Sequence, residues 1–220
     1  MKLSVINYTG ENYRDCLNFT KPSWGKAGGI IIYSDSDKLG IKKYEPMGED
    51  FDGHCKRKIL TVKDIIKNHK GQEFVYLDTD VYMRECPKEV FEDNPNADLI
   101  VTRMVRRKRF HHPEINAGVF FFRANDRTEK MCDLWLELEA ENRAKGNVKY
   151  PEQNALEQIA YMGYDHEIDL KVANVSENIY NFERDNRDDL IAGMNNAKLV
   201  HFKGLVWKVG KVVNSLRDVL

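Results

Sequence analysis

The chain has 220 residues, a mass of 25.6 kDa and a formal net charge of −1, with 31% charged residues. That length suits one substantial hydrophobic core, so we expect residues 1–220 to form a single α/β domain. A charge so close to zero carries no signature of nucleic-acid binding, and we expect no nucleic acid among the partners. The four cysteines form no C-x-x-C pair, which argues against a zinc cluster or a disulfide scaffold and fits a reducing compartment.

The apolar stretches are short. The first, after Met1 and Lys2, ends at Ile6 and is too short for the core of a signal peptide. The longest runs, 30–33 and 119–122, are strand-sized and far too short to span a membrane. We therefore expect a cytoplasmic protein without an integral membrane segment.

Short apolar runs recur along the chain and predict strands at 3–8, 29–34, 74–78, 98–102, 118–123 and 198–202. Helical periodicity lies between them: one helix carries an apolar face at 59–66 and ends before Gly71. A second has its apolar face at 131–138 and ends near Gly146, and a third begins at Pro151. Alternating strands and helices predict the α/β class, with a mixed, mostly parallel sheet flanked by helices.

The segment Asp78-Thr79-Asp80 follows the third predicted strand and has apolar residues on both sides. We expect its two carboxylates to lie on one side of an extended segment. Burying two carboxylates that repel each other is costly unless a divalent cation accepts oxygen ligands from both. The alternative is a solvated acidic turn, which is our interpretation of the second Asp-x-Asp at 35–37, because lysines follow it.

Four segments stand in a recognisable order. They are Asn-Tyr-Thr-Gly-Glu-Asn-Tyr at 7–13, Leu-Asp-Thr-Asp-Val at 77–81, Ile-Asn-Ala-Gly-Val-Phe-Phe-Phe at 115–122 followed by Tyr-Pro-Glu-Gln at 150–153, and Val-His-Phe-Lys-Gly at 200–204. In order and spacing they resemble the nucleotide-sugar glycosyltransferases with the Rossmann-like GT-A fold. The likeness is to the retaining type, typified by glycogenin and lipopolysaccharide galactosyltransferases, and it covers almost the whole chain.

The resemblance implies an enzyme of the hexosyltransferase type that moves a sugar from a UDP-sugar, or less readily a GDP-sugar, to a hydroxyl with retention of configuration. The acceptor would be a glycan, a protein or a lipid-linked molecule, in the cytoplasm or, for a virus-encoded enzyme, in the host cytosol. The cofactor would be Mn²⁺, or Mg²⁺ in its place, neutralising the leaving diphosphate. Asp80 would be a metal ligand, Asp78 a metal ligand or a ribose contact, and His201 the late histidine ligand. A nitrogen ligand beside carboxylates favours Mn²⁺.

The resemblance also implies a set of contacts with the nucleotide. Tyr8 and Tyr13 would pack on the base and ribose, and Arg57 and Lys58 would reach the nucleotide from the helix before Asp78. Their structural alternatives are a core position for each tyrosine and a solvated helix start for the two cations. The diphosphate would meet the segment after His201, through Lys203, Gly204 and Lys208. The chain lacks the proline that the family places after this glycine, so either lysine fits the phosphate contact.

The sugar contacts implied by the resemblance lie in two places. Asn116 would bind sugar hydroxyls, while Ala117 and Gly118 would leave room for the ring; the alternative is a tight turn into a buried strand. Glu152 and Gln153 replace the family's usual Asp-Gln and would face the anomeric carbon, with Gln153 as a polar stabiliser. Their alternative is a plain first helical turn, where a glutamate complements the helix dipole.

Other functions stay open from the residues alone. An inverting enzyme would need a base, for which Glu114, Glu152 or Asp185 would serve. A phosphohydrolase of the haloacid-dehalogenase type would use Asp78 as nucleophile and Asp80 as acid, but it normally carries them on the first strand. A nucleotidyltransferase would need a basic, glycine-rich loop after the first strand, which 9–12 does not offer. The last alternative is a non-catalytic module that binds nucleotide-sugars.

Overall fold

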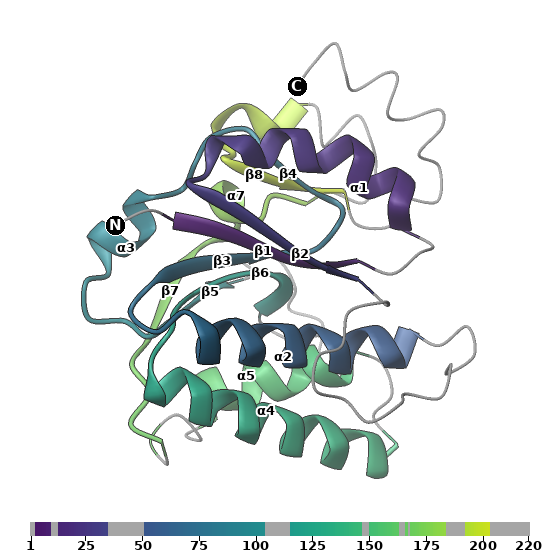
Figure 1. The fold of residues 1–220 in the computed structure, drawn as a ribbon, viewed down its shortest axis with the longest axis vertical. Helices are drawn as coiled ribbons and strands as arrows, with labels where there is room; N and C mark the ends of the chain where they lie inside the picture. Colours follow the sequence, from purple (N-terminus) through teal and green to yellow (C-terminus); the bar gives the residue numbers. More distant parts are fainter. Residues whose placement is uncertain are drawn as a thin grey trace.

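The computed structural model describes residues 3–9, 13–34, 51–103, 115–146, 150–162, 166, 168–183 and 192–202, with the backbone alone for 51–54. Among these residues a six-stranded sheet runs through the centre (Figure 1). Its strands, in spatial order, are β2 (Gly29–Ser34), β1 (Leu3–Thr9), β3 (Glu73–Leu77), β6 (Ile115–Arg123), β5 (Leu99–Arg103) and β7 (Val172–Ser176).

The sheet is mixed. Strand β1 lies parallel to β2 and to β3, and β5 lies parallel to β7. Strand β6 runs antiparallel to both of its neighbours, β3 and β5. This confirms the predicted α/β class with a mixed, mostly parallel sheet. Because β6 is reversed, its first residues lie at the same edge as the carboxyl ends of β3 and β5.

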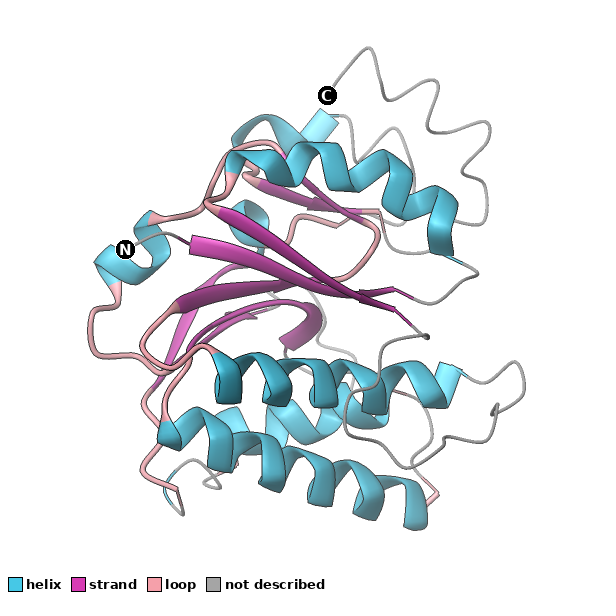
Figure 2. Cartoon of the chain, viewed as in Figure 1, coloured by secondary structure: helices cyan, strands magenta, loops and turns pink. Residues whose placement is uncertain are grey.

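Helices flank the sheet on both faces (Figure 2). One face is covered by α2 (Phe51–Asn68), α4 (Asp126–Ala144) and α5 (Pro151–Tyr161). The other face is covered by the short helices η2 (Lys21–Lys26) and α3 (Glu89–Asp93) and by a two-stranded sheet of β4 (Val81–Met83) and β8 (Leu199–His201). Further helices in the described part of the chain are α1 (Arg14–Thr20), α7 (Glu177–Tyr180) and η3 (Met194–Asn196).

Strand β6 shows why its sequence is apolar without interruption. Phe120 and Phe122 face the layer of α2, α4 and α5, while Val119 and Phe121 face the opposite layer. A strand buried on both faces needs apolar residues at every position rather than at alternate ones. The ring of Phe120 also lies edge-on to Trp135 of α4, with centroids 5.5 Å apart, which ties this helix to the sheet.

The predicted helix boundaries are confirmed. Gly71 follows α2 with φ of 84°, and Gly146 follows α4 with φ of 81°, the left-handed conformation that glycine adopts most easily. The proline of α5 stands in its first turn, where its missing N–H costs no hydrogen bond. Among the described residues, none of the helices combines the length and the apolar character needed to cross a bilayer.

Three details differ from the sequence-based expectations. The strand predicted at 198–202 pairs with β4 in the small sheet, not with the central sheet. Strands β4 and β7 were not predicted, because β4 has only three residues and β7 alternates polar and apolar residues without a strong apolar run. The Asn-Ala-Gly segment at 116–118 lies inside β6 rather than in a turn before it.

Candidate functional site

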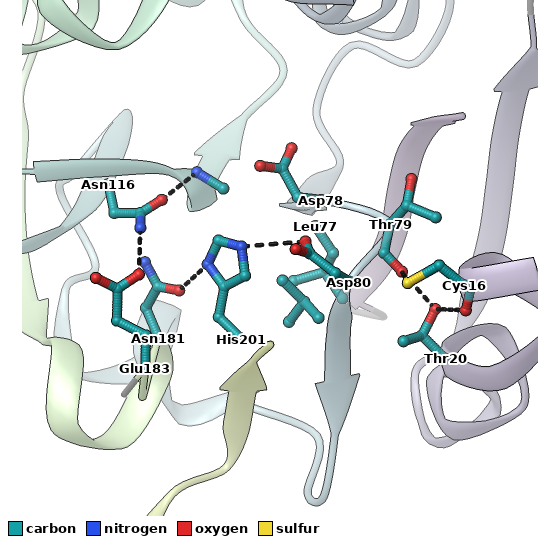
Figure 3. Close-up of polar contacts among 12 residues, drawn as sticks. Cys16, Thr20, Leu77, Asp78, Thr79, Asp80, Asn116, Asn181, Glu183 and His201 are labelled. Atoms are coloured by element: carbon teal, nitrogen blue, oxygen red, sulfur yellow. Dashed lines mark hydrogen bonds and ion pairs between the residues drawn. The ribbon is translucent and has the colours of Figure 1, made fainter. Parts of the chain in front are cut away.

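The two aspartates lie in a turn between β3 and β4. The backbone amide of Val81 donates to the carbonyl of Asp78 over 3.0 Å, which closes a four-residue turn over 78–81. The expectation of an extended segment was therefore wrong. A turn still directs both carboxylates to one side, because the residue between them, Thr79, points the other way (Figure 3).

Thr79 anchors this turn to the elements before it. Its carbonyl accepts a hydrogen bond of 2.6 Å from the hydroxyl of Thr20 and one of 3.4 Å from the thiol of Cys16. Its own hydroxyl lies 3.0 Å from that of Thr9 and 3.4 Å from the amide nitrogen of Asn7. With its carbonyl and its hydroxyl both bound on the inner side, Thr79 holds the turn so that Asp78 and Asp80 face the site (Figure 3).

The small sheet brings His201 to these carboxylates. In the antiparallel pair of β4 and β8, Val81 stands opposite His201, so the ring lies beside the turn. Its Nε2 is 3.1 Å from Oδ1 of Asp80. Burial by itself would lower the pKa of His201, but Asp80 raises it above its ordinary value. Burial likewise acts to raise the pKa of Asp80, and His201 lowers it. Each of the two residues thus favours the charged form of the other.

Asp78, Asp80 and His201 fit a divalent cation. Each offers one ligand atom, and these atoms all lie within 4.8 Å of one another. Two carboxylate oxygens and an imidazole nitrogen are a common donor set for a divalent transition metal. The backbone of Gly118 leaves the necessary space, because a Cβ there would lie 2.4 Å from Cε1 of His201 and 2.8 Å from Oδ2 of Asp78.

Lys58 is buried beneath the carboxylates rather than solvated at a helix start. Its Nζ is 3.0 Å from Oδ1 of Asp78 and donates to the carbonyl of Ala117 over 3.2 Å. It also lies 3.8 Å from Oε1 of Glu152. Burial acts to lower the pKa of this ammonium group, but Asp78 and further negative groups raise it above its ordinary value. Lys58 therefore stays charged and holds Asp78 in place.

The start of β6 faces the same site. The amide nitrogen of Asn116 donates to Oε2 of Glu183 over 2.9 Å, and its carbonyl accepts from the backbone of Gly118 over 2.8 Å. The backbone amide of Ala117 donates to Oε1 of Gln153 over 3.1 Å. Gln153 is itself buried, and through this bond it holds the β6 backbone beside Asp78 and His201.

Glu152 lies deeper than its neighbour. Only 4% of the residue is exposed, and its Oε2 has no hydrogen-bond partner among the described residues. Burial, and then Glu152, raise the pKa of the adjacent Cys55 thiol. The carboxylate thus sits behind Lys58, and that it faces the anomeric carbon stays a prediction.

The aromatic residues of the first segment lie near the carboxyl end of β1. Tyr8 is buried, and its hydroxyl accepts a hydrogen bond of 2.7 Å from Arg57. Tyr13 is half-buried; burial, followed by Asp80 and Asp78, raises the pKa of its phenol, which places the ring on the acidic side of the site. Three further predicted residues lie outside the described part of the chain: Lys203, Gly204 and Lys208.

Some residues of the site were missed by sequence reasoning. Asn181 and Glu183 follow α7 and contact His201 and Asn116, but no spacing in the sequence connects them to either. Thr20 likewise belongs to a helix whose link to Thr79 exists only in three dimensions. Asn7 and Thr9 belong to the first segment, in which sequence reasoning selected only the two tyrosines. Their side chains help to hold the turn at 78–81.

Comparisons with known proteins agree with this architecture. The chain is similar to the crystal structure of a glycosyltransferase involved in the glycosylation of the major capsid of PBCV-1, with 16% identity, all of both chains covered and a TM-score of 0.68. It is also similar to apo GlyE from Streptococcus pneumoniae TIGR4, with 12% identity, 100% of this chain and 64% of that one covered, and a TM-score of 0.60. At these identities the likeness shows the fold. A search of curated protein sequences finds no significant match.

A family model provides the functional assignment. The model for nucleotide-diphospho-sugar transferases matches residues 24–213, which is most of the chain and includes the Asp78 turn, the start of β6 and His201. This chain therefore belongs to the nucleotide-diphospho-sugar transferase family and is a glycosyltransferase.

Proposed function

We propose that this enzyme transfers a sugar from a UDP-sugar to a hydroxyl of a glycan, a protein or a lipid-linked acceptor, with retention of configuration. Mn²⁺ is the proposed cofactor, with Mg²⁺ as the alternative. The observation that carries the proposal is the convergence of Asp78, Asp80 and His201, with ligand atoms within 4.8 Å of one another, beside Gly118 at the start of β6. The family supplies the class of donor.

The proposed cofactor site consists of the two aspartates and His201. A divalent cation bound there would supply positive charge to the diphosphate that leaves the donor. Imidazole nitrogen among the ligands favours Mn²⁺ over Mg²⁺, since Mg²⁺ prefers oxygen ligands. Lys58 supports this arrangement by holding Asp78 over 3.0 Å.

The remaining contacts with the donor follow the sequence-based expectations. For the nucleotide we propose Tyr8, Tyr13, Arg57, Lys203, Gly204 and Lys208. For the sugar we propose Asn116, Ala117, Gly118, Glu152 and Gln153. Those of these residues that the structure describes lie at one edge of the sheet. This supports a donor site there, because such folds bind ligands at the carboxyl ends of their strands.

The proposed reaction needs no dedicated protein base. The acceptor oxygen forms its bond to the anomeric carbon on the face from which the phosphate departs. The carbon–oxygen bond to the phosphate breaks with its electron pair on the phosphate, which takes the acceptor's proton. The burial of Glu152 supports this scheme, since a carboxylate that is 4% exposed and close to Lys58 is badly placed to deprotonate an incoming hydroxyl. Glu114 and Asp185 lie outside the described residues.

We also propose that residues 1–220 form one domain that acts in the cytosol, or in the host cytosol if the protein is virus-encoded. Six of the described strands share one central sheet, and all four cysteines are free thiols, which supports a reducing compartment. A protein-linked glycan acceptor is supported by the similar structure involved in glycosylation of the PBCV-1 capsid. The phosphohydrolase alternative is disfavoured because Asp78 follows the third strand in the chain, not the first.

The first test is a thermal-shift titration with UDP, GDP and a panel of UDP-sugars, each with Mn²⁺ or with EDTA. A ligand that binds only the folded state raises the melting temperature by mass action. We expect a shift with UDP that requires Mn²⁺ and that disappears in Asp80→Asn. An equal shift in EDTA would show that the metal assignment is wrong.

The second test concerns the chemistry. Product NMR should show the donor's anomeric configuration in the new linkage, and an inverted product would exclude the front-face scheme. Asp80→Asn should lose transfer in saturating Mn²⁺. If wild-type protein binds UDP-sugar with Mn²⁺ but transfers nothing to any glycan, protein or lipid-linked acceptor, the binding-module alternative takes precedence.

A further inference from the structure

The ring of His201 is held from behind by a chain of buried hydrogen bonds that ends in the central sheet. Its Nδ1 lies 3.0 Å from Oδ1 of Asn181 (Figure 3). The amide nitrogen of Asn181 donates to the hydroxyl of Thr102 over 3.0 Å, and that hydroxyl donates to the carbonyl of Val119 over 3.3 Å. Thr102, Asn181 and His201 are all at least 97% buried, so water does not compete for these groups.

The last of these hydrogen bonds determines which atom donates and which accepts in each of the others. The carbonyl of Val119 only accepts, so the hydroxyl proton of Thr102 points to it and the hydroxyl oxygen is left to accept. The group that Asn181 turns toward Thr102 is therefore its NH₂, and the carbonyl oxygen of its side chain faces His201. Since that oxygen also only accepts, Nδ1 of His201 carries a proton.

We propose that Asn181, backed by Thr102, is a positioning residue that fixes His201 with its proton on Nδ1, so that the lone pair of Nε2 faces Asp78 and Asp80. That this lone pair serves to bind a cation rests on the proposed function. If these hydrogen bonds ran in the reverse direction, the proton would lie on Nε2, which is 3.1 Å from Asp80, and that nitrogen could not act as a ligand. The sequence shows no sign of this role, because Asn181 stands between Tyr180 and Phe182, far from Asp80 in the chain.

The orientation of His201 bears on the choice of metal. A nitrogen ligand is the feature of this site that separates transition metals from Mg²⁺, which prefers oxygen. Partners that orient a metal-bound histidine typically change metal affinity by about 10- to 100-fold when they are removed. Removal of the Asn181 acceptor should therefore weaken Mn²⁺ binding more than Mg²⁺ binding.

The first experiment measures the tautomer without any metal. Protein labelled with ¹⁵N-histidine is studied by long-range proton–nitrogen NMR, in EDTA and at a pH where the imidazole is neutral. The chain has six histidines, and His201→Asn identifies the resonances of His201. We expect Nδ1–H in wild type and a shift toward Nε2–H in Asn181→Leu. Nε2–H in wild type, or no change in the variant, would overturn the inference.

The second experiment measures metal affinity. Mn²⁺ and Mg²⁺ are titrated with UDP present, by calorimetry and by the EPR signal of free Mn²⁺. Asn181→Leu should lose about 10- to 100-fold in Mn²⁺ affinity and clearly less in Mg²⁺ affinity. Asn181→Asp, which keeps an acceptor for Nδ1–H, should recover most of the Mn²⁺ affinity. Equal losses for both metals would overturn the inference, because they would show a merely structural role.

A matched control is available in Asn142, which is 5% exposed and donates to Gln158 over 3.1 Å between α4 and α5. Asn142→Leu should lower thermal stability but leave the His201 tautomer and the Mn²⁺ affinity as in wild type. If wild-type protein binds no Mn²⁺ at all, the proposed metal site fails. The metal-free NMR measurement still decides the role of Asn181 in that event.

Discussion

The backbone amide of Asp78 donates a hydrogen bond of 2.7 Å to the carbonyl of Gly118. This bond joins the end of β3 to the start of β6 and sets the first aspartate against a residue without a side chain. The ring of His201 and a carboxylate oxygen of Asp78 both approach Gly118 where a Cβ would otherwise stand. One glycine thus lies between two residues of the proposed metal site, which are more than a hundred positions apart in the sequence.

Gly118→Ala should disrupt this site. The new Cβ would lie 2.4 Å from Cε1 of His201 and 2.8 Å from Oδ2 of Asp78, and the backbone is held on both sides by hydrogen bonds. We expect a loss of about 1–3 kcal/mol in stability and at least about a tenfold loss in Mn²⁺ affinity. Gly25→Ala is the control, because a Cβ at the exposed Gly25 meets nothing within 4 Å. Equal Mn²⁺ affinities in the two variants would contradict the prediction.

Thr79→Val and Thr61→Val form a matched pair. Both hydroxyls are buried, but that of Thr79 binds Thr9 and Asn7, whereas that of Thr61 has no hydrogen-bond partner among the described residues. Thr79→Val should cost about 1–3 kcal/mol and weaken Mn²⁺ binding, because the turn loses the hydroxyl contacts that help to anchor it, while the bonds to the Thr79 carbonyl remain. Thr61→Val should be neutral or slightly stabilising. Denaturant unfolding and Mn²⁺ titration measure both effects, and a destabilised Thr61→Val would count against this account.

Lys58→Met should destabilise the protein chiefly through Glu152. Removal of the ammonium group leaves Glu152 buried without the ion-pair partner that Lys58 provides, while the side chain of Asp78 is exposed enough to be solvated. We expect a loss of about 2–4 kcal/mol in EDTA at neutral pH. Adding Glu152→Gln to Lys58→Met should recover part of that loss. Strictly additive effects in this double-mutant cycle would show that the two residues are not coupled.

Asp98 offers a test of pH dependence far from the proposed metal site. Its carboxylate accepts hydrogen bonds from Arg127 (2.6 and 2.7 Å), Asn125 (2.7 Å) and the backbone of Lys171 (2.9 Å). Burial acts to raise the pKa of Asp98, but Arg127, the Lys171 amide and Asn125 bring it below its ordinary value. A lowered folded-state pKa contributes stability that is complete above the unfolded-state pKa of about 4 and is lost as the pH falls through the folded-state value.

Asp98→Asn should therefore cost about 2–4 kcal/mol at pH 7, and its difference from wild type should shrink as the pH falls below about 4. Urea unfolding at a series of pH values measures this difference. A difference that stays constant down to pH 2 would contradict the assignment. The Mn²⁺ affinity of the folded variant at pH 7 should match that of wild type, because Asp98 precedes β5 at the edge of the sheet opposite the proposed site.

Much of the architecture was accessible from the sequence. Apolar runs such as 119–122 predict buried strands, and glycines after periodic segments predict where α2 and α4 end, because these signals depend only on local periodicity and backbone conformation. The Asp-x-Asp segment identified the edge of the sheet where the site lies, since two flanked carboxylates are too costly to bury without a cation. The order of the four segments also pointed to the family that the comparison shows.

The sequence by itself therefore determined the fold class and the family, and it predicted the types of residue at the proposed site. Only the tertiary structure decided their arrangement: the turn at Asp78, the reversed strand that carries Asn116, and the small sheet that delivers His201. It also decided that Asn181 and Thr102 stand behind the histidine. These relations involve strand direction and side-chain contacts between distant segments. Such contacts leave no periodic pattern in the chain, because they depend on which elements pack together and not on the local preferences of either one.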